Sequence, residues 1–295
     1  MKITFRGVRG SIAVPGEKTV RTGGNTSCIE VRTDTGELLI LDAGTGIFAL
    51  SQTLFGQLPL TMHLFITHTH WDHIQGLPFL LPTFIPGNTI HIYGAFDPVK
   101  NATIQETLGR QWEYIYFPVR EAELAANLHF HTLREGQTVT TASASVTGVL
   151  MNHPVINLGY RIESNGRSLF FTGDHEPAYN FYAPADPEYA SYERLLAQRH
   201  AQQLELIRGV DVLIADTSYT SEDLPSKRGW GHGSYGTSLA LARDAGVKHL
   251  FFTHHEPTRS DDALQTVFEA VKAEHEASGN PFELHLACEN ASFSW

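Results

Sequence analysis

The segment TMHLFITHTHWDHIQGLP, residues 61–78, places three histidines and an aspartate within six positions, directly after an apolar run. These residues are His68, His70, Asp72 and His73. Imidazole and carboxylate groups are typical zinc ligands and also suit manganese and iron. Four such side chains on one loop cannot all reach a single tetrahedral ion without strain, so two ions that share them are the simpler arrangement. The cluster therefore predicts a metal centre, because buried histidines without a metal would each need another partner.

Two later segments repeat this pattern of an apolar run followed by polar side chains. RSLFFTGD ends at Asp174, and HLFFTHH ends at His254 and His255. Adjacent residues of an extended chain point to opposite sides, so only one of the two histidines should face the metals. We expect His254 to do so, because it follows LFFT as His68 follows LFIT. His255 is expected to support the site indirectly or to lie at the surface.

The elements that must position these residues are mostly strands in the first half of the chain and alternating helices and strands afterwards. Strand patterns bounded by turn residues include KITFRGV, CIEVRT, ELLILD and LTMHLFIT. Helical patterns cover GIFALSQTL, PEYASYERLLAQRHAQQLELIRG and DDALQTVFEAVKAEHEAS. This order favours an α/β protein in which two sheets pack face to face with helices outside. No linker interrupts residues 1–295, so one domain is expected, with residues 98–130 as a possible inserted arm or lid.

The composition limits the classes of function. The net charge of −11 argues against broad, sequence-independent binding to nucleic acid. No apolar run is long enough to span a membrane, and the first residues lack the apolar core of a signal peptide. The two cysteines, Cys28 and Cys288, have no CxxC partner and are expected to be free thiols. The expected location is therefore the cytoplasm.

The motif HTHWDH resembles the HxHxDH signature of the metallo-β-lactamase superfamily. The resemblance extends over nearly the whole chain, in the expected order, through LDAGTG (41–46), NHPVINLGYRIE (152–163), FFTGD (170–174) and LFFTHHEP (250–257). Within the superfamily, the segments GYRIE and WGHGS resemble motifs of the branch that contains RNase Z and small phosphodiesterases. The resemblance implies a four-layer αββα sandwich of two mixed sheets, with a metal site at one end.

The resemblance also implies a ligand set for two ions, which are expected to be Zn²⁺, with Mn²⁺ or Fe as alternatives. One ion would be held by His68, His70 and His153, the other by Asp72, His73 and His254, with Asp174 between them. Two such ions lower the pKa of a bound water and neutralise phosphate oxygens. Asp72 is therefore counted as catalytic too, and Asp42 is expected to support the histidine loop rather than to bind metal. The resemblance also suggests a homodimer.

A histidine outside the ligand set indicates the type of hydrolysis. His232 lies between glycines in GWGHGSYG, which resembles the HST motif of the RNase Z branch, although this chain has His-Gly-Ser. Asp216, at the end of DVLIAD, resembles an acidic residue that is Glu in that branch. A carboxylate beside His232 would raise the pKa of the imidazole, so that it could protonate a leaving alkoxide. A phosphodiester needs such help because its leaving group is poor.

Residues that would hold the substrate are less clearly indicated. Lys227, Arg228, Ser234 and Asn25 are the candidates, because they lie on polar loops beside the predicted site. The loops RGVRGS (6–11) and GGNTS (23–27) could present N–H groups to an anion or could be simple glycine turns. The aromatic residues of QWEYIYFP (111–118) could stack on a base, contact a second subunit or pack internally.

These observations predict a dinuclear metal phosphodiesterase that acts on a small phosphodiester, namely a cyclic nucleotide or a cyclic phosphate. A stable complex with nucleic acid is not expected, because residues 98–130 contain few lysines. The alternatives are a lactone or thioester hydrolase and an RNase Z-like ribonuclease. A catalytically silent nucleotide sensor is the alternative from another class, although enzymes that become sensors tend to lose the residues that are present here.

Overall fold

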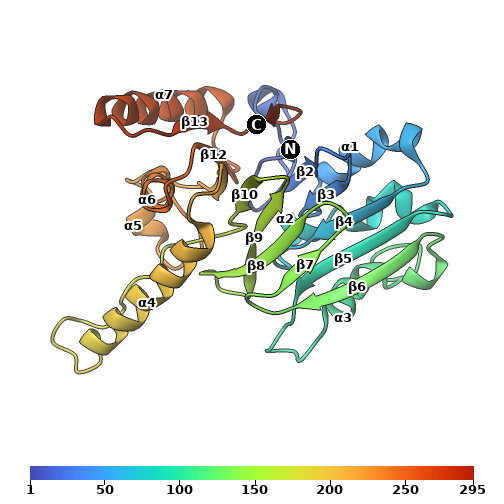
Figure 1. Cartoon of the computed structure of the whole chain (residues 1–295), viewed down its shortest axis with the longest axis horizontal. Coiled ribbons are helices and arrows are strands. Elements are labelled where there is room, and N and C mark those ends of the chain that lie inside the picture. The colour runs from blue at the N-terminus through green and yellow to red at the C-terminus, as the bar shows by residue number, and fades with distance from the viewer.

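A computed structural model describes residues 1–295 as two seven-stranded sheets that face each other, with helices on the outer sides (Figure 1). The fold class predicted from the sequence is confirmed. Both sheets are mixed, and each contains an antiparallel half and a parallel half.

The first sheet has the order β14-β1-β2-β3-β4-β5-β6. Its strands are β14 (Ser292–Ser294), β1 (Lys2–Gly7), β2 (Cys28–Arg32), β3 (Leu38–Leu41), β4 (Thr61–Phe65), β5 (Thr89–Ala95) and β6 (Asn127–Leu133). The pairs from β3 to β6 are parallel and therefore need long connections. The helices in these connections are α1 (Gly46–Thr53), α2 (Trp71–Ile74) and α3 (Ile104–Gly109).

The second sheet has the order β13-β12-β11-β10-β9-β8-β7. Its strands are β7 (Thr138–Thr140), β8 (Ser145–Met151), β9 (Asn157–Ser164), β10 (Arg167–Phe171), β11 (Val212–Asp216), β12 (His249–Thr253) and β13 (Glu283–Leu286). The segment TVTTASASVTGVLM, which reads as one strand in the sequence, forms the hairpin β7–β8. The pairs from β10 to β13 are parallel, so helices also connect these strands.

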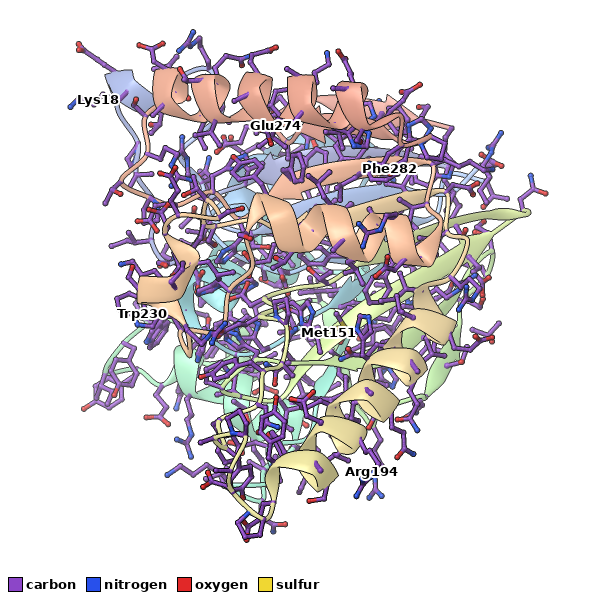
Figure 2. All side chains as sticks on the ribbon, turned by 90° about the vertical axis from the view of Figure 1, so that its left-hand side faces the viewer. Lys18, Met151, Arg194, Trp230, Glu274 and Phe282 are labelled. Atoms are coloured by element: carbon purple, nitrogen blue, oxygen red, sulfur yellow. The ribbon has the colours of Figure 1, made fainter.

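Helices cover the outer face of the second sheet (Figure 2). They are α4 (Tyr189–Ile207), α5 (Leu224–Lys227), α6 (Tyr235–Ala245) and α7 (Asp261–Ser278). In the view of Figure 2, α7, α6 and α4 lie one above the other, with Met151 between α6 and α4. Ser260 caps the N-terminus of α7, and Gly279 ends that helix in the left-handed conformation. No helix of the protein has both the length and the apolar character needed to cross a membrane.

Apolar side chains from both sheets fill the space between them. Phe5, Phe65 and Phe171 belong to this buried cluster. Separate apolar clusters lie under α1 and α3 on one side and under α6 and α7 on the other. The strands β3 and β11 are buried on both faces, as their continuous apolar sequences LLIL and VLIAD require. This packing gives a rigid frame for the loops at the strand ends.

The segment between β5 and β6 differs in detail from the predicted arm. It contains α3 and two 3-10 turns, Arg110–Trp112 and Glu121–Glu123, and β6 already begins at Asn127. Trp112 is 2% exposed and packs in the core, so it cannot stack on a base. Tyr114 and Tyr116, two and four residues later, are exposed. Whether this segment acts as a lid stays a prediction.

Candidate metal centre and active site

The predicted site residues follow strands of both sheets at the edge where the carboxyl ends of the parallel strands meet. Asp42 follows β3, and the histidine loop follows β4 in the first sheet. In the second sheet, Asp174 follows β10, Asp216 ends β11 and His254 follows β12. Because parallel strands end at the same edge, residues more than 200 positions apart come together there.

The first group of possible metal ligands consists of His68, His70, His153 and Asp174. His153 Nε2 lies 3.1 Å from His70 Nδ1 and 3.8 Å from Asp174 Oδ2. His68 Nε2 lies 3.5 Å from the same carboxylate oxygen. Two atoms bound to one tetrahedral zinc ion at its usual bond lengths are separated by roughly 3.3–3.4 Å. The spacing of the first group therefore suits one ion.

The second group consists of Asp72, His73, Asp174 and His254, all of them buried. His73 Nε2 lies 3.3 Å from His254 Nε2, and each of these nitrogens lies 3.1 Å from Asp174 Oδ1. Asp72 Oδ2 lies 3.2 Å from His254 Nε2. Asp174 thus directs one oxygen to each group, as a carboxylate shared by two metal ions would.

The buried polar atoms of the centre fit a pair of cations. Both carboxylate oxygens of Asp174 and the Nε2 atom of His68 are buried without a hydrogen-bond partner in the protein. Burial alone would raise the pKa of Asp174, but the surrounding imidazoles hold it well below its usual range. Conversely, burial would lower the pKa of His73, but Asp174 and Asp72 raise it well above its usual value. The site therefore attracts positive charge, and metal binding would release a proton from His73.

Asp42 does not face the metal groups but hydrogen-bonds the residues that do. Its Oδ2 accepts from His73 Nδ1 at 2.7 Å, and its Oδ1 accepts from the Thr67 backbone N–H at 2.8 Å. Ser27 donates to the same carboxylate at 3.2 Å. These bonds fix the tautomer of His73 and leave its Nε2 free for a metal.

We expect the Asp42→Asn variant to bind metal about 10- to 100-fold more weakly than the unmodified protein, because His73 loses its charged orienting partner. Competition with a chelator, followed by mass spectrometry of the retained metal, measures this loss. Ser27→Ala removes only the longest of these bonds and is the matched control. Equal metal retention in Asp42→Asn and the unmodified protein would contradict the prediction.

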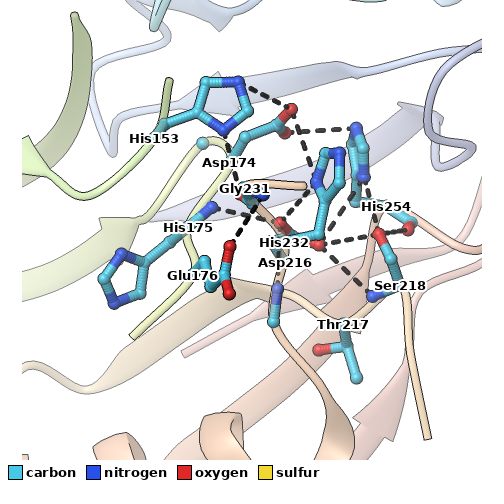
Figure 3. A network of polar contacts seen from close by, with 12 residues as sticks. His153, Asp174, His175, Glu176, Asp216, Thr217, Ser218, Gly231, His232 and His254 are labelled. Atoms are coloured by element: carbon cyan, nitrogen blue, oxygen red, sulfur yellow. Dashed lines mark hydrogen bonds and ion pairs between the residues drawn. The ribbon is translucent and has the colours of Figure 1, made fainter. Parts of the chain in front are cut away.

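His232 and Asp216 form a hydrogen-bonded pair beside the second group (Figure 3). His232 Nδ1 lies 3.0 Å from Asp216 Oδ2, and the His232 ring stacks on His254 with centroids 4.9 Å apart. Burial by itself would lower the pKa of His232, but the carboxylates of Asp216 and Asp174 raise it to about 9. His232 is therefore a protonated, partly buried imidazole that can donate a proton near neutral pH.

Asp216 has further partners that hold its carboxylate in place. Its Oδ1 accepts from the hydroxyl of Ser218 at 2.9 Å, and its Oδ2 accepts from the backbone N–H of His175 at 3.1 Å. The same Ser218 hydroxyl lies 3.0 Å from His254 Nδ1. Ser218 thus connects the His232 pair to a candidate metal ligand. No pattern in the sequence indicates this role, although Ser218 stands only two positions after Asp216 in ADTS.

Glu176, which the sequence analysis also missed, holds the loop that carries His232. Its buried carboxylate accepts from the backbone N–H groups of Gly229 and Gly231 at 2.9 Å each (Figure 3). The Gly231 carbonyl in turn lies 2.9 Å from His153 Nδ1. Gly231 has a φ of +89°, and a Cβ atom there would lie 2.4 Å from His153 Nδ1, so only glycine fits. The only sequence signal was an acidic residue two positions after Asp174.

We expect Glu176→Gln to lower turnover by roughly tenfold while leaving the metal content unchanged, because an amide accepts fewer of the loop N–H bonds. Steady-state kinetics and metal analysis of the same preparation measure both quantities. Glu188→Gln, in the exposed segment before α4, is the control. Full activity in Glu176→Gln would show that the bonds to Gly229 and Gly231 do not position His232.

The structure gives several predicted substrate-binding residues other partners. Ser234 is 1% exposed and its side chain caps α6, so it does not face a substrate. Asn25 donates its side-chain N–H to Glu289 at 2.9 Å. The Lys227 Nζ atom lies 4.1 Å from the centroid of the Trp230 ring. Figure 2 shows Trp230 at the margin of the molecule. These positions favour structural roles.

The positions of Arg228, His255 and the loop RGVRGS bear on three further predictions. Arg228 is exposed and lies over the ring of Tyr179 at 4.7 Å, which leaves it able to attract an anion. His255 is buried and donates to the Ala287 carbonyl at 2.9 Å, so the surface alternative for it is wrong. In the loop RGVRGS, the Ser11 N–H donates to Asp72 Oδ2 at 2.7 Å. That loop therefore orients a candidate metal ligand.

Comparison with known proteins gives the same family as the sequence motifs. A family model described as "Beta-lactamase superfamily domain" matches residues 38–255. A Ribonuclease Z of Haloarcula marismortui is 24% identical over 305 residues, covering 92% of each chain. Zn²⁺-bound PqqB of Methylobacterium extorquens has a TM-score of 0.67 at 19% identity over the whole of both chains. A diphosphatase of the PhnP family has a TM-score of 0.64 at 18% identity, covering 100% of this chain and 97% of that one.

These relatives correct one expectation from the sequence. The charge of the chain and the scarcity of lysines in residues 98–130 predict a small-molecule partner and no stable complex with nucleic acid. The Ribonuclease Z relatives, by their name, act on RNA. The expectation that excluded nucleic acid is therefore wrong, since net charge describes the average surface and not the local field at a site with two cations.

Proposed function

The chain belongs to the metallo-β-lactamase superfamily. We propose that it is a metal-dependent hydrolase that cleaves a nucleotide phosphodiester with two zinc ions and with His232 as general acid. The observation that carries the proposal is the hydrogen-bonded His232–Asp216 pair, in which His232 Nδ1 lies 3.0 Å from Asp216 Oδ2 and 3.6 Å from Asp174 Oδ2. A thioester hydrolase has little use for a proton donor at this place, because a thiolate leaves without one.

The two groups around Asp174 would hold the ions. The first would use His68, His70 and His153, and the second Asp72, His73 and His254. Imidazole and carboxylate ligands with several buried members favour zinc, although manganese and iron accept the same donors. Two such ions supply a water of lowered pKa and neutralise the phosphate oxygens.

The protein groups then supply the proton. Asp216 accepts from His232 Nδ1, which leaves Nε2 of that ring as the atom that can transfer a proton. When the P–O bond breaks, the leaving oxygen takes this proton, and His232 becomes a neutral imidazole that remains bonded to Asp216. Ser218 and the His175 N–H keep the carboxylate oriented throughout, because neither bond depends on the charge of His232.

RNA is the first candidate substrate, because the similar curated proteins are named for that activity. A cyclic nucleotide is the second candidate. It is favoured by the segment between β5 and β6, where the Arg120 side chain is already paired with Glu123 and Tyr114 is exposed. In that segment the carboxylates outnumber the cations, which are Lys100, Arg110 and Arg120. A net negative segment with exposed tyrosines suits a single base better than a long phosphate backbone.

Separate assays of the two substrate classes test the proposal. Zinc-loaded protein is incubated with an RNA hairpin that carries a single-stranded 3′ extension, and separately with 2′,3′- and 3′,5′-cyclic nucleotides. The proposal expects hydrolysis of at least one class, with loss in His232→Ala. Two bound metals without turnover of any phosphodiester would instead support the sensor alternative.

A further inference from the structure

A separate cluster of metal-ligand side chains lies outside the active centre, on strands β12 and β13 of the second sheet. It consists of His249 at the start of β12 and of Glu283 and His285 on β13. His249 is the direct cross-strand partner of Glu283, and His285 is two residues further along β13. The three side chains therefore share one face of a parallel strand pair. Figure 1 shows β12 and β13 beside α7 and near the C-terminus.

The ligand atoms of this group have the spacing of a tetrahedral site. His249 Nδ1 lies 3.3 Å from His285 Nε2 and 3.4 Å from Glu283 Oε2. His285 Nε2 lies 3.7 Å from the same carboxylate oxygen. Atoms bound to one zinc ion are separated by roughly 3.3–3.4 Å, so the three atoms come close to one face of its coordination tetrahedron.

Aromatic side chains hold the two imidazoles in place. The His285 ring stacks on Phe251 with centroids 4.4 Å apart, and Phe293 of β14 lies 4.8 Å from the His249 ring. The side chains of His249 and His285 are 20% and 25% exposed, whereas that of Glu283 is 70% exposed. Two half-buried nitrogens and one exposed carboxylate thus leave an open side through which an ion and its water can enter.

We propose that His249, Glu283 and His285 bind a divalent cation of the zinc type at a site separate from the active centre. This cation would connect β12 to the edge strand β13. The donor set of two imidazoles and a carboxylate is typical of three-ligand zinc sites that keep a position for water. Burial and the neighbouring His249 lower the pKa of His285, which keeps its imidazole neutral and available for a metal.

The proposed site is distinct from the active centre on the same strand. His249 begins β12 and His254 follows its end, so the two lie roughly 16 Å apart along an extended strand. None of His249, Glu283 and His285 belongs to either ligand group of the active centre. Because β13 is the last strand of its sheet, an ion here would stabilise an edge that is paired on one side only.

Metal titration of the full-length protein tests the inference as a difference between variants. Zn²⁺ binding is measured for the unmodified protein and for Glu283→Gln and His285→Ala, each after chelator treatment. We expect each variant to bind one equivalent fewer than the unmodified protein, or to bind that equivalent at least about tenfold more weakly. His200→Ala, an exposed histidine on α4, controls for the loss of a surface imidazole.

Phosphodiester turnover and a cobalt spectrum separate this inference from the proposed function. Turnover should be unchanged in Glu283→Gln, whose side chain is too exposed for the substitution to affect folding. The visible absorption of the Co²⁺-loaded protein should lose one component in that variant. An unchanged stoichiometry and an unchanged Co²⁺ spectrum in both variants would overturn the inference, whatever the active centre is found to hydrolyse.

Discussion

Asp174→Asn is expected to lower phosphodiester turnover by more than about 10³-fold, because this one carboxylate faces both metal groups. Its two oxygens are buried and accept no hydrogen bond in the protein, and the groups they face are imidazole nitrogens at 3.1 Å or more. An amide keeps the shape of the side chain but removes the charge that holds the cations together. Metal analysis should accordingly find fewer than two ions in the active centre.

The control for this substitution is Asp262→Asn, in the exposed first turn of α7, which makes the same change of charge away from the centre. It should retain both active-centre metals and full turnover. If Asp174→Asn kept both ions and more than about a tenth of the activity, Asp174 would not be the shared ligand.

His232→Ala is expected to lower turnover of a nucleotide substrate by about 10²–10⁴-fold while both metals are retained. The reason is that an alkoxide leaves poorly without a proton, and His232 is the protonated group beside Asp174. The loss should be much smaller for bis(p-nitrophenyl) phosphate, because nitrophenolate leaves without a proton. The ratio of the two losses is the measurement, and equal losses would contradict the role of His232 as an acid.

The pH profile gives a second readout of the same role. A general acid acts in its protonated form, so turnover should fall as pH rises through the pKa of His232. That pKa is raised to about 9, and cations bound at Asp174 would lower it, which places the midpoint of the fall at or below about pH 9. The alkaline fall due to this group should be absent in His232→Ala.

The sequence allowed the fold class and the main residues of the site to be predicted because both depend on local patterns. Apolar runs such as LFIT and LFFT predict buried strands, and polar residues directly after them must lie at strand ends. The parallel arrangement then brings Asp42, His68 and His254 to one edge. The ligand assignments of these residues remain predictions until metal is measured.

Other features could not be read from the sequence because they depend on contacts between distant segments. The Glu176 carboxylate meets N–H groups more than 50 positions later, and backbone donors leave no pattern in a sequence. Ser234 looked like a loop residue beside His232, but it caps α6. His249 and His285 come together only because α7 returns the chain to the neighbouring parallel strand. Net charge misled for a related reason, since it does not report where charges lie.

Hydrolysis of bis(p-nitrophenyl) phosphate, beside a thioester, a lactone and a β-lactam, tests the central claim most directly when metal content is measured on the same preparation. The account predicts about two active-centre metals per chain and turnover confined to the phosphodiester, lost on chelation and restored by zinc. Turnover confined to the carbon esters would contradict it, because the centre would then not hydrolyse phosphodiesters.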